Sequence, residues 1–384
     1  MTSWKTYRLG DLCDTISDTY KGCADEVVLI NTSDVLEGKC LNHTKEPNRN
    51  LKGQFKKTFK KYDILYSEIR PANKRFAYID FDATNYIAST KLMVLRHNEK
   101  IEPLYLYYIL QSQSIIDELQ MLAESRSGTF PQITFAELSR LEVKLPNREV
   151  QRQILGILGA IDDKIENNRR INTNLELQAQ ALYKQWFVDN RSDNWEEIKL
   201  GDIIEISKKS ITPSQFENTI FEHYSLPAYD DGKQPTFDRG QDIKSSKFVI
   251  NNGMFLFSKL NPYIKRIWFP NIGTEHAICS TEFIPYKPKR VDMLGLCYSI
   301  VNSEHFYDYV LSLTNGSTGS HQRFHPVDTL EYPLCIPSEK YIEKFESLVM
   351  PMYKEIAHNR KENRRLATLR DTLLPKLMNG EIKL

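Results

Sequence analysis

Residues 145–172 read LPNREVQRQILGILGAIDDKIENNRRIN, and this stretch decides the fold of the chain. Its apolar side chains recur at alternating spacings of four and three residues, beginning at Ile154, Leu158, Ile161 and Ile165. That spacing is the heptad pattern of a helix that packs along one seam against another helix. Asn147 is a good N-cap, because its side-chain oxygen can accept from backbone N–H groups of the first turn. The stretch therefore predicts a long helix that needs a partner.

The partner is a second copy of the pattern, 191 residues further along. Residues 336–363 read IPSEKYIEKFESLVMPMYKEIAHNRKEN, with Ser338 at the N-cap position. The expected seam of the first helix is Ile154, Leu158, Ile161, Ile165, Asn168, Asn172, Leu175 and Leu182, and that of the second is Phe345, Val349, Met352, Ile356, Asn359, Asn363, Leu366 and Leu373. Proline removes a backbone donor and clashes with the preceding turn, so Pro375 predicts a kink or an end near Leu374.

Two asparagines interrupt the seam at matched places in both copies. A buried asparagine fixes the register of a coiled coil, because it is tolerated only opposite another hydrogen-bonding group. Antiparallel pairing puts Asn168 opposite Asn363 and Asn172 opposite Asn359, since both pairs of numbers add to 531. The alternative is that the asparagines lie on a polar face of two ordinary amphipathic helices. At ~1.5 Å per residue, each helix would be ~60 Å long and would hold two attached domains well apart.

The rest of the chain repeats at the same offset. The motif W-x4-L-G-D opens both halves, at Trp4 and at Trp195, and residues 66–75 (YSEIRPANKR) recur as residues 257–266 (FSKLNPYIKR). Short apolar runs bounded by Gly, Pro and Asn predict strands, with helical patches at 104–121 and 292–313 between them. We therefore expect an α+β fold in which two mixed α/β domains, 1–146 and 191–337, are joined in a pseudo-two-fold arrangement by antiparallel coiled-coil helices within 147–190 and 338–384.

Composition favours a cytoplasmic protein. With 384 residues and 41% hydrophobic content the chain can bury two or more cores of ordinary domain size, yet it contains no apolar stretch of ~20 residues and no export signal at its start. The six cysteines form no C-x-x-C pair, and the one grouping with histidine, Cys23 and Cys40 with His43, lacks good zinc spacing. We expect reduced thiols and no metal site.

Motifs for catalysis are missing from the sequence. There is no G-x-x-x-x-G-K-[ST] loop, no glycine-rich cofactor fingerprint and no H-E-x-x-H. The tripeptide that begins at Asn261 resembles the N-P-P-Y loop of amino-methyltransferases but lacks the second proline, and its copy at Arg70 reads R-P-A. We predict that the chain is not an enzyme.

The layout of mixed domain, long helix, mixed domain and C-terminal helix resembles the specificity subunit of type I restriction and modification enzymes. The resemblance covers the whole chain and is carried by residues 145–172, by the C-terminal LRDTLLPKLMNGEI and by the W-x4-L-G-D motifs. It implies that each mixed domain is a target recognition domain reading one half of a split duplex DNA sequence, and that the helices set the spacing. It also implies docking of two methyltransferase subunits and of restriction subunits, with S-adenosylmethionine, ATP and magnesium in those partners and no cofactor in this chain.

The duplication separates residues expected to support the fold or bind phosphate from residues expected to read bases. Phosphate contacts position a protein on DNA and base contacts specify the sequence, so residues identical in both halves should serve fold or phosphate, and differing residues should read bases. The identical candidates are Lys74, Arg75, Lys265 and Arg266, with Ser67 and Ser258; being ion-paired or solvent-facing is their alternative role. The differing candidates are Arg70, Asn73, Lys91 and Gln132 in the first half and Asn261, Tyr263, Glu282 and Arg323 in the second.

Two further sets complete the expected DNA interface. Glycine-turn loops that can approach a backbone closely are Ser127, Gly128 and Thr129, and Thr318, Gly319 and Ser320. The net charge is only +1, so phosphate needs local clusters, of which the best contains Lys56, Lys57 and Lys60. A solvated lysine face is the alternative there.

Two rival functions belong to other classes. A self-contained DNA methyltransferase or nuclease would bind S-adenosylmethionine or cleave DNA by itself. A scaffold that holds other proteins would have no salt-dependent affinity for duplex DNA.

Overall fold

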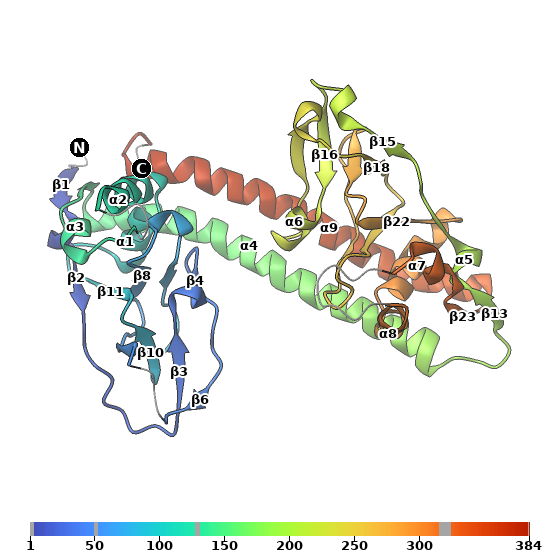
Figure 1. Ribbon diagram of the computed structural model, residues 1–384, viewed down its shortest axis with the longest axis horizontal. Coiled ribbons are helices and arrows are strands. Elements are labelled where there is room, and N and C mark those ends of the chain that lie inside the picture. The colour runs from blue at the N-terminus through green and yellow to red at the C-terminus, as the bar shows by residue number, and fades with distance from the viewer. Residues whose placement is uncertain (1–3, 50–52, 127–130, 315–323, 383) are drawn as a thin grey trace. The chain divides into compact units, whose positions relative to one another are not determined.

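The computed structural model (Figure 1) describes residues 4–49, 53–126, 131–314, 324–382 and 384. The chain divides into two compact units, one made of residues 1–161 and 368–384 and the other of residues 162–367. Both mix helices and sheets, as the composition of the segments predicts. The long helices α4 (Arg148–Tyr183) and α9 (Glu339–Met378) each contribute one segment to each unit.

The first unit contains two four-stranded sheets, with strand orders β2-β11-β8-β9 and β6-β3-β10-β7. In the second of these β3 and β10 are parallel neighbours. The elements are β1 (Lys5–Arg8), β2 (Cys13–Ile16), β3 (Glu26–Ile30), β4 (Val35–Leu36), β5 (Lys39–Cys40), β6 (Glu46–Pro47), β7 (Phe55–Lys57), β8 (Ile64–Ser67), β9 (Phe76–Tyr78), β10 (Tyr86–Ser89), β11 (Leu92–His97), α1 (Pro103–Leu110), α2 (Gln113–Arg126), α3 (Phe135–Leu138) and β12 (Glu142–Leu145).

The second unit repeats the order of the central strands, with sheet orders β14-β22-β19-β20 and β15-β18-β21-β16-β17. Here β16 and β21 are the parallel neighbours. The elements are β13 (Glu196–Lys199), α5 (Leu200–Ile203), β14 (Ile204–Ile206), β15 (Ser210–Ile211), β16 (Ile220–Tyr224), α6 (Leu226–Asp230), β17 (Thr236–Arg239), β18 (Lys247–Val249), β19 (Phe255–Ser258), β20 (Ile267–Trp268), β21 (Ala277–Cys279), β22 (Phe283–Pro288), α7 (Leu294–Val301), α8 (Glu304–Ser312) and β23 (Pro333–Ile336).

The 191-residue offset holds for secondary structure as well as for sequence. Strands β8 and β19, strands β11 and β22, and helices α1 and α7 each begin 191 residues apart. The offset changes to 194 residues between β3 and β16, which lie between the matched W-x4-L-G-D motif and the matched segment that begins at Tyr66. The two units therefore share the order of their central strands. They differ in that β15 extends the second sheet of the second unit, while β4 and β5 form a separate two-stranded sheet in the first.

Both helical patches expected between the strands are confirmed, and each consists of two helices. Residues 104–121 divide into α1 and α2, and residues 292–313 divide into α7 and α8. The second break is capped by Ser303, whose hydroxyl accepts from the backbone N–H of Phe306 at 3.2 Å. Ending one helix and starting another lets two short helices each bury a face against the sheet.

The seam asparagines of α4 and α9 pair as the antiparallel register predicts. Asn168 Nδ2 donates to Asn363 Oδ1 at 2.9 Å, and Asn359 Nδ2 donates to Asn172 Oδ1 at 3.0 Å. Asn168 also donates to Glu362 Oε2 at 2.6 Å. All four asparagines are buried, so their hydrogen bonds are not shared with water. The two helices therefore run antiparallel within the second unit.

Each unit uses the helix faces to complete its core. In the first unit Ile154 and Leu158 of α4 lie in one apolar cluster with Leu377 of α9. In the second unit Phe345 and Val349 of α9 join the cluster built on α7 and the β22 sheet. The cap at the start of α4 is the predicted one, since Asn147 Oδ1 accepts from the N–H of Val150 at 3.0 Å.

Of the two outcomes predicted at Pro375, an end of α9 near Leu374 is wrong, and a kink there stays a prediction. The helix includes Pro375 and continues to Met378. Leu377 is buried, with Leu373, Leu374 and Met378 packed against the same core. Burying a leucine side chain is worth about 1.5–3 kcal/mol, which offsets the loss of one backbone hydrogen bond near the helix end.

Glu346 of α9 ties the N-terminus of α7 to the long helix. Its carboxylate accepts from the backbone N–H groups of Gly295 at 3.2 Å and Leu296 at 2.7 Å. Burial raises the pKa of this carboxyl to about 7, and the hydrogen bonds oppose the rise. Asp292 and Cys297 lie close enough to interact with it electrostatically.

The raised pKa makes stability depend on pH. Between the ordinary pKa of 4.5 and about 7, the folded chain keeps a proton that the unfolded chain has lost. The contribution of Glu346 to stability is therefore complete below pH 4.5 and is lost as the pH rises to about 7, by at most about 3 kcal/mol. Urea unfolding of wild type and Glu346→Gln at pH 5 and pH 7.5 should show a wild-type decrease that the variant lacks. An increase in the stability of wild type relative to the variant between pH 5 and pH 7.5 would contradict this.

The asparagine pairs can be tested by replacing one partner or both. Asn359→Leu leaves the buried Asn172 amide without its partner, so we expect the free energy of unfolding to fall by about 1–3 kcal/mol. The double variant Asn172→Leu/Asn359→Leu replaces the pair with apolar side chains and should recover most of the loss. Circular dichroism during urea unfolding measures both. A double variant no more stable than the single one would refute the pairing.

Candidate nucleic-acid interface

The matched loops after β8 and β19 are built on one serine-based turn. Ser67 Oγ accepts from the N–H of Ile69 at 3.1 Å, and Ser258 Oγ accepts from that of Leu260 at 3.2 Å. The same serines close the loops, because their N–H groups donate to the carbonyls of Arg75 at 2.8 Å and Arg266 at 2.9 Å. The two units thus present the same loop frame.

Both loops hold a non-glycine residue in the left-handed backbone region at the same position. Arg70 has φ of 46° and Asn261 has φ of 49°. In each case the residue's carbonyl accepts from the N–H three residues later, that of Asn73 at 2.8 Å and that of Ile264 at 2.9 Å. Asparagine tolerates this conformation, whereas arginine adopts it at some cost. Strained backbone is retained mainly where a site uses it, which favours a functional role for these loops.

A second turn lies beside each loop, at Lys91 in the first unit and at Glu282 in the second. Its charge therefore has opposite sign in the two units. The N–H groups of Glu68 and Lys259 donate to the carbonyls of Lys91 and Glu282, both at 3.0 Å. The first unit thus places glutamate on the loop and lysine on the turn, and the second unit reverses them. Lys91 Nζ lies 3.9 Å from Glu68 Oε2.

The first unit adds Gln132 to this group. Its side-chain oxygen accepts from Lys91 Nζ at 3.3 Å, and the backbone around Gln132 forms a bridge with Ile69. The structure therefore brings together Arg70, Lys91 and Gln132, three of the residues expected to read bases. It adds Glu68, which the sequence comparison missed along with Lys259. The signal was available, because Glu68 and Lys259 are themselves 191 residues apart and opposite in charge.

The second unit exposes apolar side chains on the same frame. Tyr263 is 64% exposed and Ile264 is 52% exposed, next to Asn261. Their counterparts in the first unit are Ala72 and Asn73, of which Ala72 donates its N–H to Gln120 at 3.0 Å. The surfaces of the two frames therefore differ in shape as well as in charge.

The four cations shared by both halves all contact their own unit. Arg75 Nη1 donates to the carbonyls of Ser33 and Val35, at 3.1 and 3.4 Å, and Lys74 Nζ lies 3.7 Å from Glu37.

In the second unit Lys265 Nζ donates to the Asn302 carbonyl at 2.7 Å and to Glu304 at 2.9 Å. Arg266 binds Asp230 through two hydrogen bonds of 2.8 and 2.9 Å, which raise the pKa of the guanidinium. Arg75, Lys265 and Arg266 thus hydrogen-bond to their own unit, and Lys74 makes a longer, exposed ion pair. Whether these cations also contact phosphate stays a prediction.

The lysine cluster also divides by role. Lys57 is half-buried, and its ammonium donates to the carbonyls of Thr90 at 3.0 Å and Leu92 at 2.8 Å, beneath the Lys91 turn. Burial lowers the pKa of Lys57, and the nearby Glu68 opposes this. Lys56 and Lys60 are exposed. Ser127, Gly128, Thr129, Thr318, Gly319, Ser320 and Arg323 lie outside the described residues.

Comparisons with known proteins support one family. The model of the type I restriction modification DNA specificity domain matches residues 1–177. The type I restriction enzyme HindI specificity subunit of Haemophilus influenzae is 31% identical over the full length of both chains. The chain belongs to the family of type I restriction enzyme specificity subunits. Its expected role as a non-catalytic component that recognises DNA is confirmed by this membership.

Two other members extend the likeness. The MjaIX specificity subunit of Methanocaldococcus jannaschii is 28% identical over 73% of this chain and 69% of its own. The fold is shared with the crystal structure of the type I restriction-modification system S subunit from M. genitalium, with a TM-score of 0.59 at 16% identity, covering 98% of this chain and 96% of that one. Among the described residues of this specificity subunit, no helix is long and apolar enough to cross a membrane, and no cluster of His, Cys, Asp or Glu suits a metal ion.

Substituting Arg266 tests whether this residue braces the loop or contacts phosphate. Arg266→Gln removes both bonds to Asp230, a partly exposed carboxylate, so we expect about 1 kcal/mol less stability. The affinity for duplex DNA should keep its salt dependence, because a bracing residue neutralises no phosphate. Thermal unfolding and binding titrations at several salt concentrations test both expectations. The matched variant Arg75→Gln is the control, and a shallower salt dependence for Arg266→Gln would show a phosphate contact instead.

Proposed function

We propose that the chain reads a bipartite duplex DNA target, with the loop frame of each unit reading one half-site. The observation that carries this proposal is one backbone frame bearing different side chains in the two units. Glu68 and Lys91 in the first unit correspond to Lys259 and Glu282 in the second. A frame that is kept while its charges are reversed suits two readings of different sequences by one mechanism.

The chemistry of each frame suits different base edges. Arg70 and Lys91 are suited to guanine O6 and N7, and Gln132 to adenine. In the second unit Asn261 suits adenine and Glu282 can accept from cytosine N4. Tyr263 and Ile264 add apolar surface that can contact a thymine methyl group. Lys56 and Lys60, which are exposed, are the proposed phosphate contacts of the first unit.

We further propose that α4 and α9 act as the spacer between target recognition domains 1–146 and 191–337. The asparagine pairs support this role, because they allow one antiparallel register of the two helices. An antiparallel pair relates its attached domains by a rotation near 180°, and a duplex with two half-sites has a matching approximate dyad. The outer faces of the helices would dock two methyltransferase subunits. Restriction subunits, S-adenosylmethionine, ATP and magnesium belong to the complete cytoplasmic assembly.

Co-purification and methylation mapping test the proposal together. The tagged chain is co-expressed with its neighbouring genes, purified, and the host genome is sequenced by a single-molecule method that detects methylated adenine. We expect a methyltransferase to co-purify and methylation to mark a split motif that is lost when either half is deleted. A chain that binds S-adenosylmethionine or cleaves DNA by itself supports the enzyme alternative. A chain without salt-dependent duplex affinity supports the scaffold alternative.

Charge reversal at the matched turn should change one half-site only. Glu282→Lys places the first unit's charge on the second frame, and a good base contact is worth about 1–3 kcal/mol of discrimination. We expect the methylated motif to change or relax in the half read by the second unit and to persist in the other. Lys91→Glu is the matched variant and should affect the opposite half. Unchanged motifs in both variants, with normal methylation, would exclude these positions as readers.

A further inference from the structure

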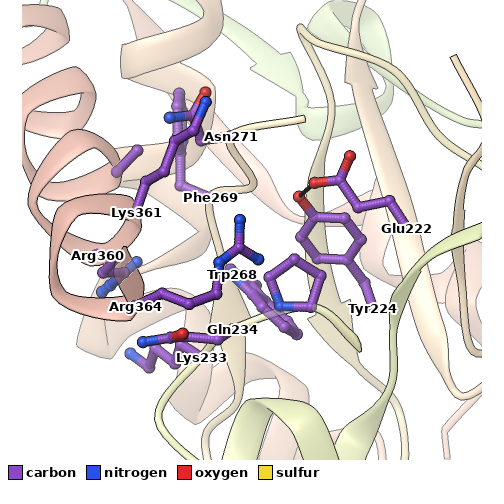
Figure 2. Close-up of a pocket in the computed structure, with 12 residues that line it drawn as sticks. Glu222, Tyr224, Lys233, Gln234, Trp268, Phe269, Asn271, Arg360, Lys361 and Arg364 are labelled. Carbon is purple, nitrogen blue, oxygen red and sulfur yellow. Dashed lines mark hydrogen bonds between the residues drawn. The ribbon is translucent and has the colours of Figure 1, made fainter. Parts of the chain in front are cut away.

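A cationic pocket lies in the second unit between α9 and the β16 sheet (Figure 2). Its cavity volume is about 30 Å³, and the pocket opens to solvent. Its cations are Arg360, Lys361 and Arg364 from α9 and Lys233 from the segment after α6. Figure 2 shows Arg364 reaching from the helix into the space in front of Trp268. Helix α9 and the segment after α6 therefore both contribute cations to this pocket.

The carboxylates near the pocket do not balance these charges. Glu176 of α4 lies 3.8 Å from Arg360 and also interacts electrostatically with Lys233. Arg360 and Lys233 repel each other, and burial lowers the pKa of Lys233. One acidic group is therefore shared between two cations, one of which is largely removed from water.

The pocket's own carboxylate is already satisfied by neutral donors. Glu222 accepts from the Tyr224 hydroxyl at 2.8 Å, from the N–H groups of Gly273 at 2.9 Å and Thr274 at 3.0 Å, and from the Thr274 hydroxyl at 3.1 Å. A carboxylate that accepts several hydrogen bonds is stable as an anion without a cation beside it. It holds the loop at Gly273 and keeps its negative charge, so the four cations of the pocket face two carboxylates, Glu222 and Glu176.

The repeated fold does not require Arg364, whereas Lys361 corresponds to another cation, Arg170, in the first half. The counterpart of Arg364 in the first half is Thr173, so the repeat does not need arginine there. Arg364 lies over the ring of Phe237 at 5.1 Å, which orients its guanidinium at the pocket mouth. Lys361 is exposed, and none of the ion pairs among the described residues involves it. Both side chains are placed to meet an anion from outside.

We propose that this pocket binds a phosphate group, supplied by the backbone of the target DNA beside the half-site that the second unit reads. Guanidinium and ammonium groups are the usual partners of phosphate, and a partly desolvated pocket strengthens the attraction. The proposal rests on the DNA recognition proposed above and adds a contact from the spacer helix itself. Such a contact raises the affinity for every sequence and leaves the choice of sequence to the loops.

The salt dependence of DNA binding tests the site. The complex purified with its partner subunits is titrated with duplex DNA carrying the target, at several salt concentrations, as wild type, Lys361→Gln and Arg364→Gln. Each variant should bind several-fold more weakly, and its slope of log affinity against log salt should fall by about 0.9 for one lost phosphate contact. The control Lys344→Gln removes an exposed lysine of α9 outside the pocket and should change neither quantity.

A second arm identifies the source of the phosphate group. Inorganic phosphate is added to wild type and Lys361→Gln without DNA, and the unfolding temperature is measured. Inorganic phosphate could raise the unfolding temperature of wild type alone while the salt slopes of DNA binding stay unchanged in both variants. That result assigns the pocket to free phosphate and overturns the DNA contact. Unchanged slopes without protection overturn the phosphate site altogether. A wild-type complex with no salt-dependent duplex affinity refutes the proposed function itself, which separates the two failures.

Discussion

The two buried asparagine pairs are the interaction on which the arrangement of α4 and α9 depends. A slip of either helix would place Asn168 or Asn172 against an apolar side chain and leave an amide unpaired, at about 1–3 kcal/mol for each buried group. The same register decides which part of α9 reaches each core. It brings Leu377 into the cluster that contains Ile154, and Phe345 into the cluster that contains Phe187. Hydrogen bonds of modest strength thus select the register in which apolar burial stabilises both units.

Duplication gave this chain two copies of one frame and freed their exposed side chains to diverge. The serine turns and the left-handed positions at Arg70 and Asn261 are the same in both units. The charges at positions 68 and 91 are reversed at 259 and 282. Backbone hydrogen bonds carry no information about a DNA sequence, so a fold that depends on them can change its readers at small cost in stability. This separation of backbone frame from variable side chains suits the proposed reading of two different half-sites.

Local patterns made the helices, the asparagine pairs and the repeat predictable from the sequence. Helical periodicity and caps depend on residues within a few positions, and the register followed from two asparagines in each copy. The roles of the shared cations were not predictable, because their partners are distant in sequence, as Arg75 with Ser33 and Lys265 with Asn302 illustrate. The continuation of α9 past Pro375 was not predictable for the same reason, since Leu377 is buried in the core of the first unit.

A net charge of +1 limits how this chain can hold DNA. Many of its cations are committed internally, as Lys57, Arg75, Lys265 and Arg266 show, so a general positive field does not arise. Phosphate is then best held where several cations converge, as in the proposed pocket lined by Arg360, Lys361, Arg364 and Lys233. Because general attraction is weak, a larger share of the affinity must come from contacts with base edges. A recognition subunit benefits from that balance, since weak phosphate binding lowers its affinity for the many non-target sites that compete with the target.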